Sequence, residues 1–288
     1  MERLSTIADW RAYCAHQRER GRRVGLVPTM GALHEGHLSL VERARDNGDV
    51  VVLSSFVNPR QFSDDADLAR YPRTPEVDEG LAEGAGVSAL VRPELAEMWP
   101  DFPSPTLTTV SVARLGDLLE GAGRPGHFDG VASVVTKLLT VTGPCRAYFG
   151  QKDYQQLVVV RRLVRDLAFD VEVVGCPTRR DETGLALSSR NVRLSADGRQ
   201  RATALSRALR LARESSGPPS ERRALMDEVM RVAGVQVAYA EVVDAETLTP
   251  LSDEQRVVGR ALVAGFVERV RLIDNAEIDL RERGVTCC

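Results

Sequence analysis

Residues 24–41 read Val-Gly-Leu-Val-Pro-Thr-Met-Gly-Ala-Leu-His-Glu-Gly-His-Leu-Ser-Leu-Val. This stretch predicts the fold of the chain around it. The apolar run Val24–Val27 is typical of a buried parallel strand, which we expect Pro28 to end. Apolar residues recur at helical spacing after this point, so a helix is predicted to begin near Gly36 or His37. In a doubly wound sheet, a turn between such a strand and helix lies at the carboxyl edge, where ligands bind.

Two histidines, His34 and His37, stand in this turn with Gly36 between them. The first turn of a helix has unbonded backbone N–H groups and a positive dipole end, and a neutral imidazole can donate another hydrogen bond to phosphate. The zinc pattern of metalloproteases needs histidines four residues apart on a helix, so we predict no metal ligands here. Ordinary surface histidines are the other alternative. Because the chain has only four histidines, two in one corner favour phosphate contact.

The composition of the whole chain excludes some classes of function. The 288 residues are 43% hydrophobic and 27% charged, which suffices for one large or two unequal domains. A net charge of −3 gives no basic field for a nucleic-acid partner. No apolar run approaches the roughly 18 residues of a membrane span, and the charged N-terminus has no signal-peptide core. The five cysteines form no disulfide framework or metal motif, and the terminal pair Cys287-Cys288 is interpreted as a tail. We therefore expect a cytoplasmic protein.

Strand and helix patterns alternate over residues 1–176, which predicts an α/β domain with a parallel sheet. A polar loop is expected at 60–73. The other predicted strands are 50–57, 88–91, 106–112, 146–149 and 171–176. The other predicted helices are 5–20, 74–84, one opening after the Gly/Pro loop 121–127, and 154–167.

The pattern changes after residue 176, where we place a domain boundary. Residues 177–195 are polar with little periodicity. Two amphipathic helices, at about 196–215 and 220–233, are followed by predicted strands at 235–243 and 259–274. Residues 177–288 are therefore predicted to form a smaller α+β domain.

Two further clusters have side chains suited to phosphate. Lys152 and Asp153 follow Gly150 at a predicted strand-to-helix turn, where Lys152 can neutralise phosphate charge and Asp153 can hold a ribose or orient the lysine. A solvated Lys-Asp pair is the alternative. The segment 188–190, Ser-Ser-Arg, offers hydroxyls and a guanidinium, although an ordinary serine-rich loop is possible. Together with the histidine turn, they meet the electrostatic needs of attack at a nucleotide phosphate.

Seven ordered motifs extend this pattern into a resemblance that covers nearly the whole chain. They are PTMGALHEGH at 28–37, FVNPRQF at 56–62, DLARYPRT at 67–74, RPGHFDGV at 124–131, YFGQKDYQQL at 148–157, SSRN at 188–191 and RLIDN at 271–275. The sequence resembles the HxGH nucleotidyltransferase superfamily and, within it, the pantoate–β-alanine ligase family. The resemblance implies a Rossmann-like domain that binds ATP and pantoate, a smaller C-terminal lid domain, a homodimer and a requirement for Mg²⁺. It also implies that pantoate is activated by ATP to pantoyl adenylate and then condensed with β-alanine.

The resemblance also assigns roles to residues of this chain. The expected catalytic residues are His34, His37, Lys152, Ser188, Ser189 and Arg190. The expected ATP-binding residues are Met30, His37, Gly150, Lys152, Asp153, Leu187, Ser188, Ser189 and Arg190. The residues expected around pantoate or β-alanine are Met30, Asn58, Gln61, Phe62, Arg124, His127 and Gln156.

The chain departs from the family pattern at two positions. Leu187 stands where the family usually has Met, a change between similar apolar side chains that we expect to have little effect. Val77 interrupts an acidic run between Glu76 and Asp78, so we assign these carboxylates no metal role. We expect Mg²⁺ to arrive with ATP, held by phosphate oxygens and water.

Two other functions remain open on the sequence. Another HxGH transferase would share the phosphate clusters but has no evident use for Gln61 and Gln156, and a tRNA synthetase is disfavoured by the charge. A nucleotide-binding regulator without catalysis would bind ATP but show no pantoate-dependent chemistry.

Overall fold

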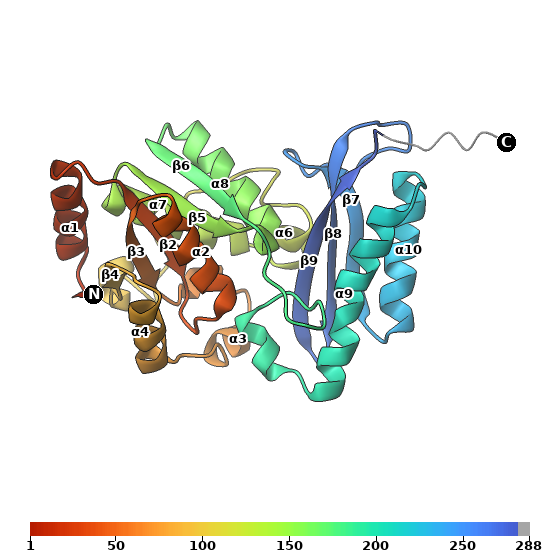
Figure 1. The fold of residues 1–288 in the computed structure, drawn as a ribbon, viewed down its shortest axis with the longest axis horizontal. Coiled ribbons are helices and arrows are strands. Elements are labelled where there is room, and N and C mark those ends of the chain that lie inside the picture. Colours follow the sequence, from red (N-terminus) through yellow and green to blue (C-terminus); the bar gives the residue numbers. More distant parts are fainter. Residues whose placement is uncertain (282–288) are drawn as a thin grey trace. The chain divides into compact units, whose positions relative to one another are not determined.

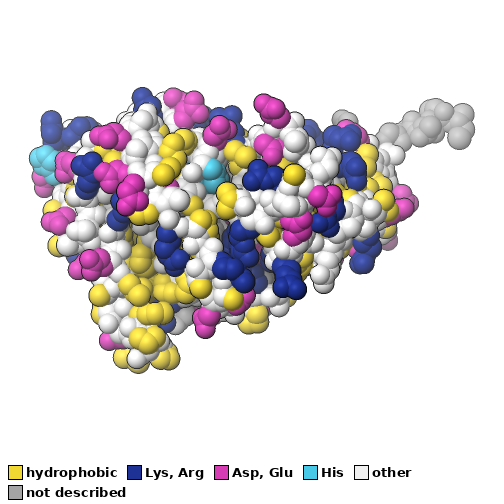
Figure 2. Space-filling model, turned by 90° about the horizontal axis from the view of Figure 1, so that it is seen from below, with side chains coloured by type: hydrophobic (Ala, Val, Ile, Leu, Met, Phe, Trp, Pro, Cys, Tyr) yellow, Lys and Arg dark blue, Asp and Glu magenta, His cyan; other side chains and the backbone are white. Residues whose placement is uncertain are grey.

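The computed structural model describes residues 1–281, so Cys287 and Cys288 lie outside the described residues. The chain divides into two compact units. Unit 1 comprises Met1–Gln151 and Gln155–Pro177, and unit 2 comprises Lys152–Tyr154 and the chain from Thr178 onward. Within the described part, no helix combines the length and apolar character needed to cross a membrane. On the face drawn in Figure 2, acidic and basic side chains are interspersed.

Unit 1 is built on a six-stranded parallel sheet with the strand order β1-β4-β3-β2-β5-β6 (Figure 1). Its strands are β1 (Glu2–Leu4), β2 (Val24–Thr29), β3 (Val50–Ser55), β4 (Ala89–Val91), β5 (Cys145–Gly150) and β6 (Val171–Cys176). The chain order reverses between β2 and β5, as in doubly wound dinucleotide-binding sheets. The predicted Rossmann-like parallel sheet is therefore confirmed.

Helices cover both faces of this sheet. The helices along residues 1–177 are α1 (Ile7–Glu19), α2 (Glu35–Asp46), α3 (Asp65–Ala69), α4 (Pro75–Gly84), α5 (Leu95–Met98), α6 (Glu120–Gly123), α7 (His127–Thr142) and α8 (Tyr154–Asp166), with 3₁₀ turns η1 (Pro59–Gln61) and η2 (Gln151–Asp153). Successive strand residues point to opposite faces, so Leu26 packs with α1, α7 and α8, whereas Val27 packs with α2 and α4. The continuous apolar run of β2 reflects burial on both faces.

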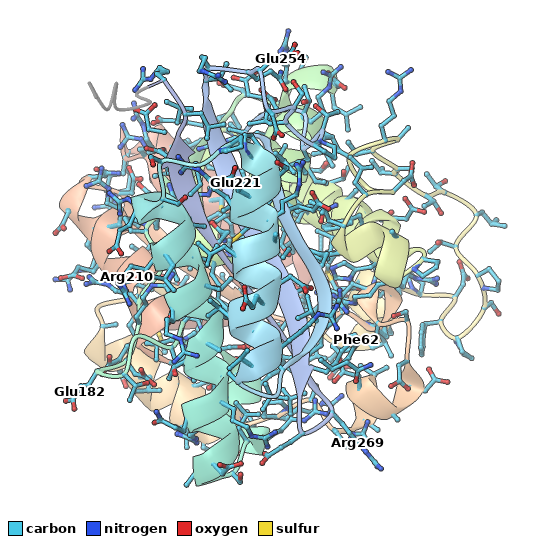
Figure 3. All side chains as sticks on the ribbon, turned by 90° about the vertical axis from the view of Figure 1, so that its right-hand side faces the viewer. Phe62, Glu182, Arg210, Glu221, Glu254 and Arg269 are labelled. Atoms are coloured by element: carbon cyan, nitrogen blue, oxygen red, sulfur yellow. The ribbon has the colours of Figure 1, made fainter. Side chains whose placement is uncertain are left out.

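Unit 2 contains a three-stranded antiparallel sheet, β7-β8-β9, with two helices on one face. Its elements are η3 (Ser189–Arg193), α9 (Ala196–Glu214), α10 (Pro219–Val232), β7 (Gln236–Asp244), β8 (Val258–Val267) and β9 (Val270–Asp279). Figure 3 looks onto α9 and α10, whose exposed residues Arg210 and Glu221 are labelled. Alanine and leucine residues of α9 pack with apolar residues of the sheet and with the α10 methionines, which gives unit 2 a core of its own.

Several predicted boundaries were wrong. Strand β2 continues through Pro28 to Thr29, because its pairing with β3 extends to Thr29. Its pairing with β5 ends at Leu26, so proline, which has no backbone N–H to donate, is tolerated at position 28. Residues 106–112 form no strand, and 60–73 contains α3. The predicted strand 259–274 is a hairpin that turns at Glu268 and Arg269, both with positive φ.

Candidate active site

The exits of β2 and β5 meet at the point where the strand order reverses, which is where doubly wound sheets bind ligands. The turn after β2 carries Met30, His34 and His37, and β5 ends at Gly150. A Cβ atom added to Gly150 would meet nothing within 4 Å, so a ligand can approach the backbone there. The topology thus brings two of the predicted motifs to one edge of the sheet.

His34 and His37 form the N-terminal cap of α2, which begins at Glu35 rather than at Gly36 or His37. The Nδ1 atom of His34 accepts a hydrogen bond from the backbone N–H of Gly36 at 3.1 Å, and Nδ1 of His37 accepts from the N–H of His34 at 3.3 Å. The two rings stack with their centroids 4.0 Å apart. Because each Nδ1 is an acceptor, the neutral imidazoles carry their protons on Nε2 and can donate them to an anion.

Asp78 on α4 holds the loop that leads to these histidines. Its carboxylate is 2% exposed and accepts hydrogen bonds from the backbone N–H of Ala32 at 2.9 Å and of Leu33 at 2.8 Å. The hydroxyl of Thr74 donates to the same carboxylate at 3.0 Å. This role of Asp78 was not predicted from the sequence. The Thr74–Asp78 spacing at the start of a predicted helix was the available signal, because it allows both side chains to turn toward one loop.

Asn58 and Gln61 form an amide pair beside Met30. The Nδ2 of Asn58 donates to Oε1 of Gln61 at 3.0 Å and to the carbonyl of Gly130 at 3.1 Å. The indole N–H of Trp99 donates to Oδ1 of Asn58 at 3.0 Å, which fixes the orientation of the first amide. The second amide then points its Nε2 at the sulfur of Met30, 3.1 Å away. A thioether is a weak acceptor, so a ligand oxygen can replace it.

Arg124 and His127 contact the same segment through its backbone. Nδ1 of His127 lies 2.7 Å from the carbonyl oxygen of Gln61, to which a guanidinium N–H of Arg124 also donates at 3.2 Å. The other nitrogen of His127 lies 3.1 Å from Nη1 of Arg124. Since a carbonyl can only accept, the imidazole donates from Nδ1 and accepts the arginine N–H at Nε2. Both side chains therefore hold Gln61 in place.

Phe62 and Gln156 are the remaining residues predicted around pantoate or β-alanine. Phe62 packs edge-on against Tyr71, with ring centroids 5.6 Å apart. Gln156 is half-buried in the first turn of α8. Its neighbour Gln155 is buried and donates to the carbonyls of Leu115 and Leu118 at 2.8 Å. Two adjacent glutamines thus occupy different environments, and Gln155 supports the loop before α6.

The other residues predicted to contact phosphate belong to unit 2. Nζ of Lys152 lies 3.5 Å from the carboxylate of Asp153, and the carbonyl of Lys152 accepts from the side chain of Asn275 at 2.9 Å. Ser188 caps η3 and accepts from the N–H of Arg190 at 3.3 Å, so the Ser188–Arg190 segment begins a short helical turn. The N–H of Leu187 donates to the carbonyl of Arg179 at 3.0 Å, which ties the turn that precedes this segment.

Metal ligands are absent as a preformed cluster from residues 1–281. No group of three or more His, Cys, Asp or Glu side chains is arranged there to hold an ion. The His34–His37 pair directs both Nδ1 atoms at backbone amides, which removes these lone pairs from metal binding.

The fold and the histidine turn after β2 together define a class of enzyme. A Rossmann-like sheet that carries His-x-Gly-His at the exit of a central strand is the arrangement of the HxGH nucleotidyltransferases. The family model described as "Pantoate-beta-alanine ligase" matches residues 2–277 of the chain. The chain belongs to the pantoate–β-alanine ligase family.

Individual relatives agree with this assignment. The chain is 47% identical to the pantothenate synthetase of Moorella thermoacetica over 98% of this chain and 100% of that protein. The crystal structure of pantothenate synthetase from Thermus thermophilus is 49% identical, with a TM-score of 0.89, and the match covers 96% of this chain and 99% of that one. A Francisella tularensis pantoate-beta-alanine ligase is 32% identical, with a TM-score of 0.80 over 96% and 97% of the chains, and its structure is described as complexed with beta-gamma ATP and beta-alanine.

Proposed function

We propose that this chain condenses pantoate with β-alanine at the expense of ATP, through pantoyl adenylate, and releases AMP, pyrophosphate and pantothenate. The observation that carries the proposal is the Gln61 amide, whose oxygen is engaged by Asn58 so that its N–H₂ group points toward Met30. A fixed N–H donor suits the oxygens of a hydroxy acid. Another HxGH transferase would share the phosphate residues but has no evident need for this donor.

In the first step, a carboxylate oxygen of pantoate bonds to the α-phosphorus of ATP while the bond to the bridging oxygen breaks and pyrophosphate leaves. Negative charge spreads over the phosphate oxygens, so hydrogen-bond donors and cations placed there lower the barrier. His34 and His37 supply Nε2–H donors from the start of α2, and Lys152 supplies a point charge. Ser188, Ser189 and Arg190 supply hydroxyls and a planar guanidinium.

In the second step, the amine of β-alanine attacks the acyl carbon of the adenylate. The nitrogen loses a proton, the bond between the acyl carbon and the phosphate oxygen breaks, and AMP leaves. Gln61 and Gln156 orient the pantoyl hydroxyls, while Met30 and Phe62 pack on its two methyl groups. Asn58, Arg124 and His127 act indirectly in this proposal, because they hold the amide and backbone of Gln61.

The proposal extends to the adenosine, the metal and the assembly. Gly150, Asp153 and Leu187 contact the adenosine, and Mg²⁺ enters with ATP as part of the substrate, held by phosphate oxygens and water. Residues 177–288 act as a lid, the protein works as a homodimer, and its location is the cytoplasm. These points rest on the family. Sedimentation at several protein concentrations tests the dimer, and titration of Mg²⁺ against fixed ATP tests the metal.

The decisive experiment is ATP–pyrophosphate exchange with pantoate present and β-alanine absent. Exchange that depends on pantoate is expected, because adenylate formation is reversible while no amine is available. Later addition of β-alanine should yield AMP and pantothenate. Folded protein that binds ATP but shows no exchange would instead indicate a nucleotide-binding regulator.

Replacement of Lys152 tests the phosphate site directly. Lys152→Ala should slow pantoate-dependent exchange by at least about tenfold, because one charge on the transferring phosphate is lost. The melting temperature should change little, since the side chain pairs with a half-exposed Asp153. Arg207→Met, at an exposed position of α9, is the control for the loss of one positive charge. A normal exchange rate in Lys152→Ala would remove this residue from the mechanism.

A further inference from the structure

The RLIDN segment at 271–275 lies in the first half of β9 and has no part in the chemistry proposed above. Its last two residues, Asp274 and Asn275, are each 3% exposed. Successive strand residues face opposite sides of a sheet. Asp274 accordingly shares the helix-covered face with Leu272, whereas Asn275 lies on the other face. Two adjacent buried polar groups thus reach both sides of the sheet.

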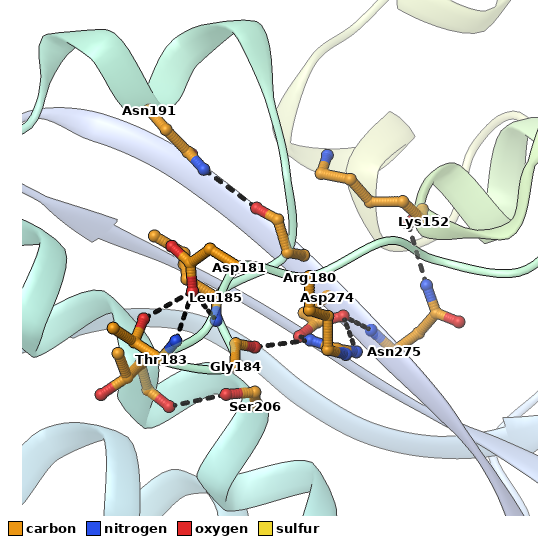
Figure 4. Close-up of polar contacts among 12 residues, drawn as sticks. Lys152, Arg180, Asp181, Thr183, Gly184, Leu185, Asn191, Ser206, Asp274 and Asn275 are labelled. Carbon is orange, nitrogen blue, oxygen red and sulfur yellow. Dashed lines mark hydrogen bonds and ion pairs between the residues drawn. The ribbon is translucent and has the colours of Figure 1, made fainter. Parts of the chain in front are cut away.

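Asn275 is tied at both ends of its amide. Oδ1 accepts from Nε of Arg260 at 2.8 Å and from Nη2 at 2.6 Å. Nδ2 donates to the backbone carbonyl of Lys152 at 2.9 Å (Figure 4). The guanidinium of Arg260 lies over the ring of Tyr154, 4.2 Å from its centroid. The arginine can only donate, so it fixes the amide oxygen on its own side and directs the amide N–H₂ at Lys152.

Asp274 holds the turn on the opposite side. Its two carboxylate oxygens accept from Nη1 of Arg180 at 2.6 Å and from Nη2 at 2.9 Å, a bidentate pair. Arg180 also pairs with Ala186 as an isolated antiparallel bridge. The N–H of Leu187 donates to the carbonyl of Arg179 beside that bridge. The turn is therefore closed by its own hydrogen bonds immediately before Ser188.

We infer that Asp274 and Asn275 are positioning residues of the adenylate-forming site. Asn275 sets the backbone from which the Lys152 side chain extends, and Asp274 sets the turn that presents Ser188, Ser189 and Arg190. The inference rests on the phosphate roles proposed for these residues. Neighbouring positions of one rigid strand thus fix two loops relative to each other. An error of about 1 Å in such an arrangement can cost a hundredfold in rate.

The substitution Asn275→Asp separates positioning from stability. The carboxylate keeps the acceptor for Arg260 and adds charge to that pair, but it places an oxygen against the Lys152 carbonyl, where the N–H₂ group was. We expect the variant to remain folded by circular dichroism, because the pairing of the new carboxylate with Arg260 offsets part of this oxygen–oxygen repulsion. Pantoate-dependent ATP–pyrophosphate exchange should fall by about tenfold or more, with a raised KM for ATP. Gln236→Glu, which adds a carboxylate at an exposed position of β7 in the same sheet, should leave exchange unchanged.

A second substitution tests the other side of the strand. Arg180→Lys keeps the positive charge beside Asp274 but loses the bidentate geometry. We expect a loss of about tenfold in exchange. Since the charge pair survives, the protein should remain folded by circular dichroism. This variant keeps the inference testable even if Asn275→Asp does not fold.

A double-mutant cycle decides between positioning and a purely structural role. If Asn275 acts through Lys152, Asn275→Asp should cause no further loss of exchange in the Lys152→Ala background. Multiplied losses would mean independent effects and would overturn the inference. Normal exchange in Asn275→Asp together with slow exchange in Lys152→Ala would also overturn it, while leaving the proposed function intact. Normal exchange in Lys152→Ala would refute the proposed phosphate role first.

Discussion

His34 performs two tasks with one ring, because Nδ1 caps α2 through the N–H of Gly36 and Nε2 carries the proton that the proposed function directs at phosphate. The two tasks can be separated by substitution. Asparagine is among the best N-cap residues, and its short side chain would satisfy the same backbone amide.

His34→Asn should therefore slow adenylate formation about a hundredfold, the usual cost of removing one donor from a developing anion. The free energy of unfolding should change by less than ~0.5 kcal/mol, since the cap is kept. Pyrophosphate exchange and urea denaturation measure the two quantities. His16→Asn, at an exposed position of α1, is the control. A large loss of stability with normal exchange would reverse the assignment and make the imidazole a cap alone.

Asp78 offers a second test at the level of one residue. In Asp78→Asn, one of the two acceptor oxygens becomes an N–H₂ group that opposes a backbone N–H of Ala32 or Leu33. Leaving a buried donor unsatisfied costs about 1–3 kcal/mol, and we expect that loss of stability with at least about a tenfold slower exchange.

Glu76→Gln removes a carboxylate from the same helical turn at an exposed position, and neither stability nor exchange should change measurably. If Asp78→Asn and Glu76→Gln behave alike, the loop before His34 does not depend on this carboxylate.

The supporting residues of the candidate site were harder to predict than the residues expected to face the ligand. The glycine-containing turn, the short histidine spacing and the single lysine after Gly150 are local signals, and the motifs that they belong to were found from sequence. Asp78, Trp99 and Asn275 act through partners 45, 41 and 123 residues away along the chain. Such pairings arise only from the tertiary fold, so hydrophobic periodicity and secondary-structure propensity cannot predict them.

Among the elements, the packing of α7 on η1 sets the position of Gln61. Gly130 lies where the helix touches this turn, and a Cβ atom there would overlap the backbone carbonyl of Arg60. The carbonyl of Gly130 also accepts from Asn58. A glycine within a helix is costly in conformational entropy, and Gly130 lies in the first turn of α7, so close approach is the physical reason for it.

Gly130→Ala should lower the free energy of unfolding by about 1–3 kcal/mol through overpacking and should raise the KM for pantoate. Chemical denaturation and steady-state kinetics at varied pantoate measure these effects. Gly80→Ala is the matched control, because a Cβ added in α4 meets nothing within 4 Å. It should raise the free energy of unfolding by about 0.5–1 kcal/mol. Equal effects of the two substitutions would refute the close approach.

Secondary-structure elements were predicted well where the hydrophobic pattern of a segment was clear. At the β2–α2 corner a strand pattern is followed by a helix pattern, and the structure differs from the prediction only at the element boundaries. The hairpin between β8 and β9 was missed because its turn uses Glu268 and Arg269 at positive φ instead of glycine or asparagine. Residues 106–112 alternate like a strand, but a strand also needs a neighbour to pair with, and Leu107 there is fully exposed.

At the scale of the whole molecule, each unit has a hydrophobic core of its own, and among residues 1–281 the tryptophans and cysteines, which can report unfolding, lie in unit 1. The two tryptophans and three of the cysteines are buried there. Trp10, Cys14, Trp99 and Cys145 belong to the core on one face of the parallel sheet, and Cys176 belongs to the core on the other. Burial raises the pKa of Cys145 to about 12 and that of Cys176 to about 11, so the reactive thiolate is disfavoured in the folded state.

These positions predict one shared transition. In a Cys287→Ser, Cys288→Ser variant, thiol labelling at pH 8 should be slow without denaturant. In urea, the extent of labelling at all three buried cysteines should follow the tryptophan fluorescence curve, because one sheet covered on both faces unfolds as a unit. Mass spectrometry of peptides resolves the three sites. Cys176 labelled at a lower urea concentration than Cys14 and Cys145 would contradict this, since it would mean that the α2–α4 face opens before the α1–α7 face. Early opening of the α2–α4 face would include the β2–α2 corner. ATP should then slow the labelling of Cys176 more than that of Cys14 and Cys145.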